Sequence, residues 1–189
     1  MNTSRLLLIL TMVVSFFLTS YSCARDETDP PQPVSNELPS PQQVKGLRAK
    51  WLDFNYGLDK ARTENKPIFV EFYTDWCVYC KMFQRETVQD QSVASVLLEN
   101  FVYVRVNAED TQKRVKFNGK YLSNVELTQS FGISAFPSLV FLDSTGQIIT
   151  TFSGFMPPRQ FAGILGYIHQ KCYQTQTSIH EFAKRGNCD

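Results

Sequence analysis

The feature that most constrains this chain is a pair of cysteines that follows an apolar run. Residues 68–73 are Ile, Phe, Val, Glu, Phe and Tyr, and Cys77 and Cys80 come a few positions later. A continuous apolar run of this length predicts a strand buried on both faces of a sheet. The residues after the pair permit a helix. The sequence therefore predicts a strand that leads into a Cys-x-x-Cys pair at the N-terminus of a helix.

The predicted position of the pair has chemical consequences. Unpaired N–H groups and the helix dipole favour a thiolate over a thiol, and cysteines so placed titrate at roughly 3.5–7.5 instead of about 8.5. We expect Cys77 to attack another protein's disulfide, and Cys80, one turn later and more buried, to resolve the mixed disulfide. The alternatives are a structural disulfide, or a zinc site in which His169 and Cys172 supply two further ligands.

The composition suits a globular domain without a marked charge. Hydrophobic residues make up 43% of the 189 residues, which is enough for a packed core, and the formal net charge is +1. Without residues 1–22, which contain Arg5 but no acidic residue, 18 basic residues balance 18 acidic ones. This balance gives no reason to expect nucleic acid or an acidic membrane surface as a partner.

Residues 1–22 have the pattern of a secretory signal peptide. Arg5 precedes the mostly apolar residues 6–18, and small residues follow. The apolar run is shorter than the roughly 20 residues that a membrane span requires. We expect export of the protein to the periplasm, with an uncleaved N-terminal anchor as the alternative.

Cys23 directly follows this segment and resembles the lipidated cysteine of bacterial lipoproteins. Ser22 suits the position before such a cysteine, whereas Ser20 stands where these signals usually carry Leu. The sequence therefore leaves two hypotheses open, a lipid anchor at Cys23 and cleavage by an ordinary signal peptidase.

The chain contains five cysteines, an odd number. Cys77 and Cys80 form one natural pair, and Cys172 and Cys188 could form a second, structural disulfide in an oxidising compartment. That leaves Cys23 alone, which a lipid would explain.

The rest of the chain divides by composition. Residues 23–45 hold five prolines and few apolar side chains, which predicts a solvated tether. Residues 46–173 are the predicted folded domain. Residues 174–189 are a predicted polar tail, in which Ile179 and Phe182 could dock back onto the domain.

Hydrophobic periodicity and turn residues predict the elements of the domain. Polar residues 107–124, with the turn signal Asn118-Gly119, predict a surface insertion, and Asn55 is a predicted helix cap. The order β-α-β-α-β-α-β-β-α predicts an α/β domain, a central mixed sheet flanked by helices. The predicted strands are 49–52, 68–73, 101–106, 138–142 and 147–152. The predicted helices are 56–65, 77–86 with a second helical piece at 91–100 after a break, 125–131 and 159–172.

This order, with Trp-Cys-Val-Tyr-Cys-Lys at residues 76–81, resembles the thioredoxin fold over about residues 49–172. Glu71 stands where that family has a buried carboxylate, and Arg105 where many members have a nearby lysine. Phe136-Pro137 stands at the place of the family's cis-proline, and Gly154 where a glycine follows the hairpin.

The closer resemblance is to exported bacterial thioredoxin-like proteins, such as the C-terminal domain of DsbD and the SoxW-like proteins. Lys-Pro-Ile at residues 66–68 and Thr-Asp at residues 74–75 carry this likeness. Val78-Tyr79 departs from the Gly-Pro of thioredoxin and the Pro-His of DsbA, and Phe136 is bulkier than the usual Thr, Val or Ile.

The resemblance implies a role for Glu71 and for Pro137. Glu71 would accept a proton from Cys80, since burial should raise the pKa of its carboxyl; the alternative is a strand-edge residue paired with Arg105 or Lys81. A cis Pro137 would place the backbone of the preceding residue beside the sulfurs, where an extended substrate segment can bond to it; the alternative is a trans proline that begins an edge strand.

The residues around the sulfurs are the predicted substrate-binding group. Trp76 and Tyr79 should offer an apolar landing patch on the surface, with core packing as the alternative. Val78 and Phe136 complete the predicted group.

The function implied by the resemblance is that of an extracytoplasmic thiol–disulfide oxidoreductase that needs no metal, flavin or nucleotide. Tyr79 cannot stabilise the Cys77 thiolate as a cationic histidine would, so the expected couple is the less oxidising one. We expect a monomeric reductant of protein disulfides, supplied with electrons by a membrane carrier of the DsbD type. The alternative is a thioredoxin-fold binding or chaperone module with a structural disulfide.

Overall fold

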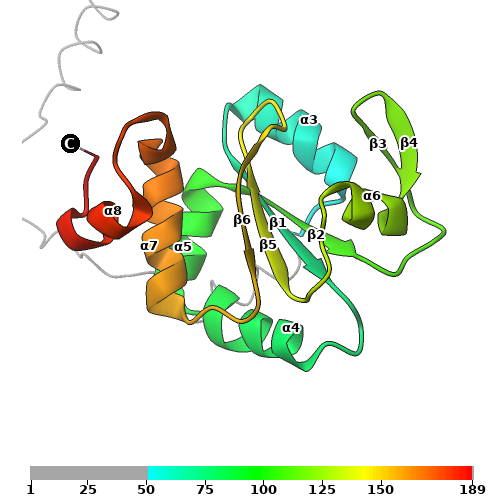
Figure 1. Cartoon of the computed structure of the whole chain (residues 1–189), viewed down its shortest axis with the longest axis horizontal. Helices are drawn as coiled ribbons and strands as arrows, with labels where there is room; N and C mark the ends of the chain where they lie inside the picture. Colours follow the sequence, from blue (N-terminus) through cyan, green and yellow to red (C-terminus); the bar gives the residue numbers. More distant parts are fainter. Residues whose placement is uncertain (1–50, 189) are drawn as a thin grey trace, which may run out of the picture. The chain divides into compact units, whose positions relative to one another are not determined.

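The strand at Ile68–Tyr73 (β1) lies inside the sheet, and its first five residues are buried, as the apolar run predicted. The computed structural model describes residues 51–188. The other strands of this sheet are β2 (Val102–Asn107), β5 (Ser138–Leu142) and β6 (Ile148–Ser153). Their order is β2-β1-β5-β6, with β1 parallel to β2, antiparallel to β5, and β6 antiparallel to β5 (Figure 1). The predicted mixed sheet is confirmed.

Helices cover both faces of the sheet, because side chains that alternate along each strand point to opposite faces. On one face, Phe69 and Phe141 pack against Phe161, with ring centroids 5.1 and 6.0 Å away. On the other, Val70 and Val104 belong to a second apolar cluster. The first face is covered by α5 (Gln91–Asn100) and α7 (Pro158–His169), the second by α3 (Phe54–Glu64) and α6 (Asn124–Ser130).

The helix after the cysteines differs from the prediction of one continuous helix. It begins as the α-helix α4 (Val78–Met82) and continues as the π-helical segment η2 (Phe83–Val88). Phe83 is fully buried and packs against Phe161 at 5.1 Å between ring centroids. The extra residue per turn in η2 adjusts which side chains face the sheet.

The predicted insertion is not an irregular segment but contains a β-hairpin. Its strands are β3 (Arg114–Phe117) and β4 (Lys120–Ser123), and they pair with each other outside the main sheet. The turn between them is Asn118-Gly119, with φ angles of 48° and 76°, the backbone conformation that favours this dipeptide in hairpins.

Asn55 anchors this hairpin, which corrects its predicted role as a helix cap. The N-cap of α3 is Asp53. The side chain of Asn55 instead donates to the carbonyl of Lys116 at 2.7 Å and accepts from its N–H at 2.9 Å. These two bonds join the backbone of Lys116, on the edge of β3 that does not pair with β4, to α3.

The predicted first strand, 49–52, is also corrected where the structure describes it. Within residues 51–53, only Leu52 pairs, in an isolated parallel bridge to Val104. The predicted signal peptide (1–22), the lipidation site Cys23 and the tether (23–45) lie outside the described residues.

Residues 174–189, predicted to be a polar tail, contain a helix, and Phe182 docks back onto the domain. α7 ends at His169, earlier than the predicted Cys172, because Lys171 takes a left-handed conformation (φ 58°). A short 3-10 turn, η3 (Cys172–Gln174), then leads to α8 (Ile179–Arg185). The ring of Phe182 meets Tyr167 edge-on at 5.7 Å.

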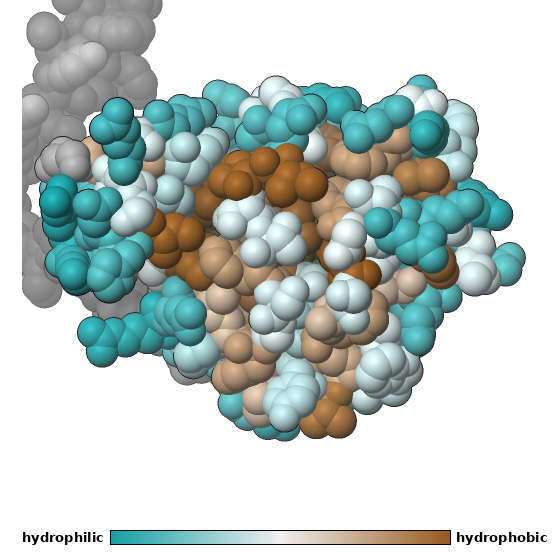
Figure 2. Space-filling view, in the orientation of Figure 1, coloured by the Kyte–Doolittle hydropathy of each residue, from teal (hydrophilic) through white to brown (hydrophobic). Residues whose placement is uncertain are grey.

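The surface is not uniform in polarity. Figure 2 shows apolar residues gathered over the middle of the viewed face, where β6 lies, and hydrophilic residues over the hairpin and over α8. Within residues 51–188, no helix combines the length and apolar character needed to cross a bilayer.

Candidate active site

Cys77 and Cys80 are joined by a disulfide at the point where β1 passes into α4. The turn between the two elements is held by the Cys77 N–H, which donates to the carbonyl of Thr74 at 3.2 Å. Cys77 is the N-cap of α4, and its Sγ accepts the backbone N–H of Cys80 at 3.0 Å. The predicted strand, cysteine pair and helix start are therefore assembled as expected, with the Cys77 sulfur at the helix N-terminus.

Cys77 is almost completely buried. Cys77 is only 3% exposed, although its neighbours Trp76, Val78 and Tyr79 are 65, 72 and 61% exposed. These three residues lie on the surface as predicted, and they are not core filling. An incoming sulfur must therefore approach a nearly enclosed atom past an apolar rim.

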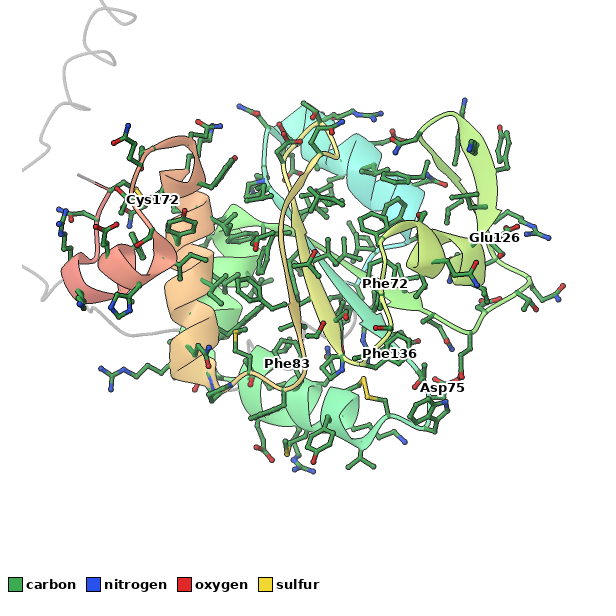
Figure 3. All side chains as sticks on the ribbon, viewed as in Figure 1. Phe72, Asp75, Phe83, Glu126, Phe136 and Cys172 are labelled. Carbon is green, nitrogen blue, oxygen red and sulfur yellow. A yellow bond between two sulfur atoms is a disulfide. The ribbon has the colours of Figure 1, made fainter. Side chains whose placement is uncertain are left out.

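Trp76 is held in place from two sides. Its indole N–H points at both carboxylate oxygens of Glu109, at 3.0 and 3.1 Å, and its ring meets Phe136 edge-on at 6.4 Å. Beside it, Asn107 donates to the carboxylate of Asp75 at 3.2 Å. Figure 3 shows Asp75 and Phe136 at the same end of the molecule. Glu109 and Asn107 were not predicted, because nothing in residues 107–124 indicates which of them return to the cysteines.

The peptide bond between Phe136 and Pro137 is cis, as the resemblance implied. Pro137 is buried and leads into β5, which is an internal strand, so the alternative of an edge strand is wrong. The carbonyl of Pro137 accepts the N–H of Gly154 at 2.8 Å. Gly154 has φ 93°, a conformation that suits glycine and strains other residues.

Glu71 is fully buried on the internal strand β1, so the alternative of a strand-edge residue is wrong. The ion pair with Arg105, however, is formed. Glu71 and Arg105 stand opposite each other on β1 and β2, and the Arg105 Nε donates to Glu71 Oε2 at 2.7 Å. The guanidinium also lies 3.8 Å from the ring centroid of Tyr73, which adds a cation–π contact.

Burial raises the pKa of Glu71, and this effect outweighs the opposing attraction and hydrogen bond of Arg105 and the hydrogen bond from Gln84. Only Oε2 is bonded. Oε1 is buried and has no hydrogen-bond partner among the described residues. A carboxyl in this state binds a proton more readily than an exposed one, which suits general acid–base chemistry.

Gln84 was missed by the sequence analysis. It belongs to η2, is buried, and donates its side-chain N–H to Glu71 Oε2. A signal was available, since Gln84 is four residues after Cys80 and three before Thr87. It therefore lies on the helix face that carries buried residues, where a polar side chain requires a partner.

The predicted zinc alternative is not assembled. Cys77 is bonded to Cys80, and Cys172 is bonded to Cys188. His169 is exposed at the end of α7. Among residues 51–188, no three His, Cys, Asp or Glu side chains are gathered in a way that could hold a metal ion.

Comparison with known proteins agrees with this architecture. A family model of the thioredoxin-like domain matches residues 54–169. The chain is 30% identical over 112 residues to the thiol:disulfide interchange protein DsbD of Pseudoalteromonas atlantica, an alignment that covers 58% of this chain and 17% of that protein. The chain thus spans about a sixth of the length of the curated relatives it matches.

Solved structures show the same fold. A thioredoxin-fold protein from Helicobacter pylori superimposes with a TM-score of 0.56 at 21% identity, covering 77% of this chain and 92% of that one. A thioredoxin from Thermus thermophilus gives 0.52 at 20% identity, covering 63% and 85%. Since the family model spans more than half of the sequence, this chain belongs to the thioredoxin-like family.

Proposed function

We propose that the protein is a thiol–disulfide oxidoreductase that reduces disulfide bonds in other proteins through Cys77 and Cys80. The observation that carries the proposal is the bond from the Cys80 N–H to Cys77 Sγ, 3.0 Å long, at the N-cap of α4. In the reduced protein this donor and the helix N-terminus stabilise a negative charge on the Cys77 sulfur.

The exchange proceeds in two steps. The Cys77 thiolate attacks one sulfur of a substrate disulfide; a Cys77–substrate bond forms, the substrate S–S bond breaks, and the other substrate sulfur leaves as a thiolate. Cys80 then gives its proton to the Glu71 carboxylate and attacks Cys77 Sγ. The Cys77–Cys80 bond forms, the second substrate sulfur leaves, and both substrate thiolates take up protons from water. The substrate gains two electrons and the cysteine pair loses them.

The exposed residues around the pair bind the substrate segment. Trp76, Val78 and Tyr79 form an apolar rim, and Phe136, which touches Trp76, continues it toward the cis Pro137. An extended segment of the substrate bonds to the backbone of Phe136 while its cysteine reaches the enclosed Cys77 sulfur. This arrangement suits a protein substrate, whose chain can enter between bulky side chains.

Residues beside the pair and at the N-terminus support the proposed direction and location. Tyr79 carries no positive charge that would stabilise the Cys77 thiolate further, so the pair acts as a reductant. A membrane electron carrier, a role suggested by the likeness to DsbD, supplies its electrons. The protein acts as an exported monomer in the periplasm, either freed from its signal peptide or anchored by a lipid on Cys23.

Insulin reduction with dithiothreitol as electron donor tests the proposal. The wild-type protein should accelerate precipitation of the insulin B chain, and Cys77→Ser should not. The double variant Cys172→Ser/Cys188→Ser is the matched control, because it removes two cysteines that are remote from the site. It should retain at least half of the wild-type rate at a temperature where it is folded. Equal rates for the wild type and Cys77→Ser would refute catalysis and favour a binding module.

Trapping and a redox titration test the finer statements. Cys80→Ser cannot resolve the mixed disulfide, so it should accumulate covalent complexes with periplasmic partners, and Cys77→Ser/Cys80→Ser should accumulate none. The reduction potential of the Cys77–Cys80 pair should lie well below the roughly −120 mV of DsbA. A potential near that value would make the protein an oxidant.

A further inference from the structure

Gln84 is a polar side chain in a place where the fold calls for an apolar one. It lies in η2 between Phe83 and Thr87, both fully buried, and is itself buried against the sheet face that carries Glu71. Its amide donates to Glu71 Oε2. An amide taken out of water costs stability unless its hydrogen bonds are replaced. The contact with Glu71 is therefore what makes a buried glutamine tolerable at this position.

The contact makes the two oxygens of Glu71 unequal. Oε2 receives two donors, the Gln84 amide and the Arg105 Nε. Oε1 is buried without a hydrogen-bond partner among the described residues. A proton that arrives at this carboxyl without breaking either bond must therefore add to Oε1.

We propose that Gln84 is a positioning residue that governs proton transfer at Glu71 and so sets the pH at which the mixed disulfide is resolved. This inference rests on the proposed exchange function. Gln84 bonds to Oε2 together with Arg105, and it leaves Oε1 as the atom that takes the proton. Because its N–H bonds to the charged carboxylate, Gln84 also favours ionised Glu71 and keeps it available as a base.

The groups around Glu71 allow this effect to be isolated. Arg105 faces it from β2, and Leu139 on β5 stands opposite it without a titratable group. Beyond, Arg105 lines a cavity of about 170 Å³ together with Asp110 and Lys113. Gln84 is neutral at every pH, so replacing it changes the hydrogen bonding of Glu71 and leaves all the charges in place.

The test uses full-length protein with Cys23→Ser, in which only the Cys77–Cys80 disulfide has been reduced and Cys172–Cys188 stays joined. It is mixed with 5,5′-dithiobis(2-nitrobenzoate) in a stopped-flow instrument. The first thionitrobenzoate released reports attack by Cys77, and the second reports attack by Cys80 on the mixed disulfide. Gln84→Met keeps the size of the side chain and removes the donor, and Gln84→Leu is a second variant with the same loss. Thr87→Val is the matched control, because Thr87 lies in η2 and bonds to the carbonyl of Met156 instead of Glu71.

Loss of the donor disfavours ionised Glu71, so fewer molecules carry the base at a given pH. A hydrogen bond to a charged group is worth enough to move a titration by about one pH unit. Gln84→Met should therefore shift the midpoint of the second release upward by about one unit and slow it roughly tenfold below the midpoint. The first release should be unchanged, and Thr87→Val should leave both profiles at wild-type values.

A double-variant comparison separates positioning from simple damage to the helix. In a Glu71→Gln background, adding Gln84→Met should not move the pH profile further. The inference is overturned if both Gln84 variants titrate like the wild type, if their shift persists without Glu71, or if Thr87→Val produces the same shift. Failure of the exchange function itself would look different, since the wild type and Cys77→Ser would then release thionitrobenzoate alike.

Discussion

The two disulfides of this chain have the same chemical bond in very different surroundings. Cys77 and Cys80 are three positions apart and close one turn at the start of α4. Cys172 and Cys188 are 16 positions apart and tie η3, which follows α7, to the segment after α8. Figure 3 shows Cys172 at the opposite end of the molecule from Asp75 and Phe136, which lie beside the first pair.

The neighbours of each pair explain what it is suited to do. Cys77 has an exposed apolar rim in front of it, and the fold places the buried Glu71 on the sheet face that the following helix covers. Cys172 is fully buried in the apolar cluster that also contains Phe182. Under the proposed function, the first environment supplies a landing surface and a proton acceptor, and the second supplies packing. The proposal therefore distinguishes a reactive disulfide from a structural one by their surroundings.

The largest expected difference is in exchange activity. Cys77→Ser removes the attacking sulfur, so insulin reduction should fall by roughly two orders of magnitude or more, toward the rate of dithiothreitol alone. Cys172→Ser/Cys188→Ser should retain at least half of the wild-type rate at a temperature where it is folded. A comparable loss in both variants would erase the distinction between the two pairs.

Stability should show the opposite pattern. Breaking the Cys172–Cys188 link frees a loop of 16 residues in the unfolded chain. The chain-entropy relation then predicts a loss of about 3 kcal/mol in the free energy of unfolding. Urea denaturation of Cys172→Ser/Cys188→Ser, with Cys77→Ser/Cys80→Ser as the control for a short loop, measures this loss. A larger loss in the control would mean that the pair after β1 is the structural one.

The apolar rim can be probed with an exposed aromatic residue from each region. Trp76→Ala removes a side chain that Glu109 and Phe136 hold beside the cysteines, and kcat/KM for insulin should drop about tenfold, the usual range for an aromatic anchor. Tyr121 on β4 is 74% exposed but lies outside the site. Tyr121→Ala should leave kcat/KM within twofold of wild type, and similar losses in both variants would argue against a localised rim.

The smallest expected effect is on the pH dependence of stability. Burial raises the pKa of Glu71 above its value in the unfolded chain, so the native state binds more protons there in the intervening range. The favourable contribution of protonated Glu71 to the free energy of unfolding is complete below the unfolded pKa of about 4.3. It is lost as the pH rises through the pKa of Glu71 in the folded protein. Glu71→Gln should therefore be more stable than wild type near pH 8, with the gain vanishing near pH 4.

Urea unfolding of the wild type and Glu71→Gln across this pH range checks the sign. Asp110→Asn is a useful contrast. The backbone N–H groups of Lys113 and Gln112 lower the pKa of Asp110, so its contribution to stability is lost as the pH falls. If Glu71→Gln were less stable than the wild type at high pH, the ion pair with Arg105 would stabilise the folded protein by more than burial of the Glu71 charge destabilises it.

Residues 68–73 and 138–142 show what the sequence could predict. Both are short apolar runs that end at turn signals, and both are strands of the sheet. The cysteine pair and the cis Pro137 were placed correctly because they are landmarks of a family, which carries information that periodicity lacks. Local sequence signals were sufficient for these strands, because a short apolar run that is buried on both faces fits a strand inside a sheet.

The misses arise where tertiary contacts decide. Residues 114–117 alternate between charged and apolar side chains before Asn118-Gly119, a hairpin signal that their high charge obscured. The change from α to π turns begins at Phe83, which packs against Phe161, a residue far away in the sequence. The same reason hid Gln84, because only the assembled sheet reveals Glu71 as its partner.

The most direct test of the central claim is differential alkylation of the full-length protein across a series of reduced and oxidised glutathione or dithiothreitol mixtures. Mass spectrometry of the tryptic peptides then reports each cysteine pair separately. Cys77 and Cys80 should become alkylated together at a potential where Cys172 and Cys188 are still joined, since the reduction potentials of structural disulfides typically lie below about −300 mV. If Cys172 and Cys188 open first while Cys77 and Cys80 stay closed, the reactive site has been assigned to the wrong end of the molecule.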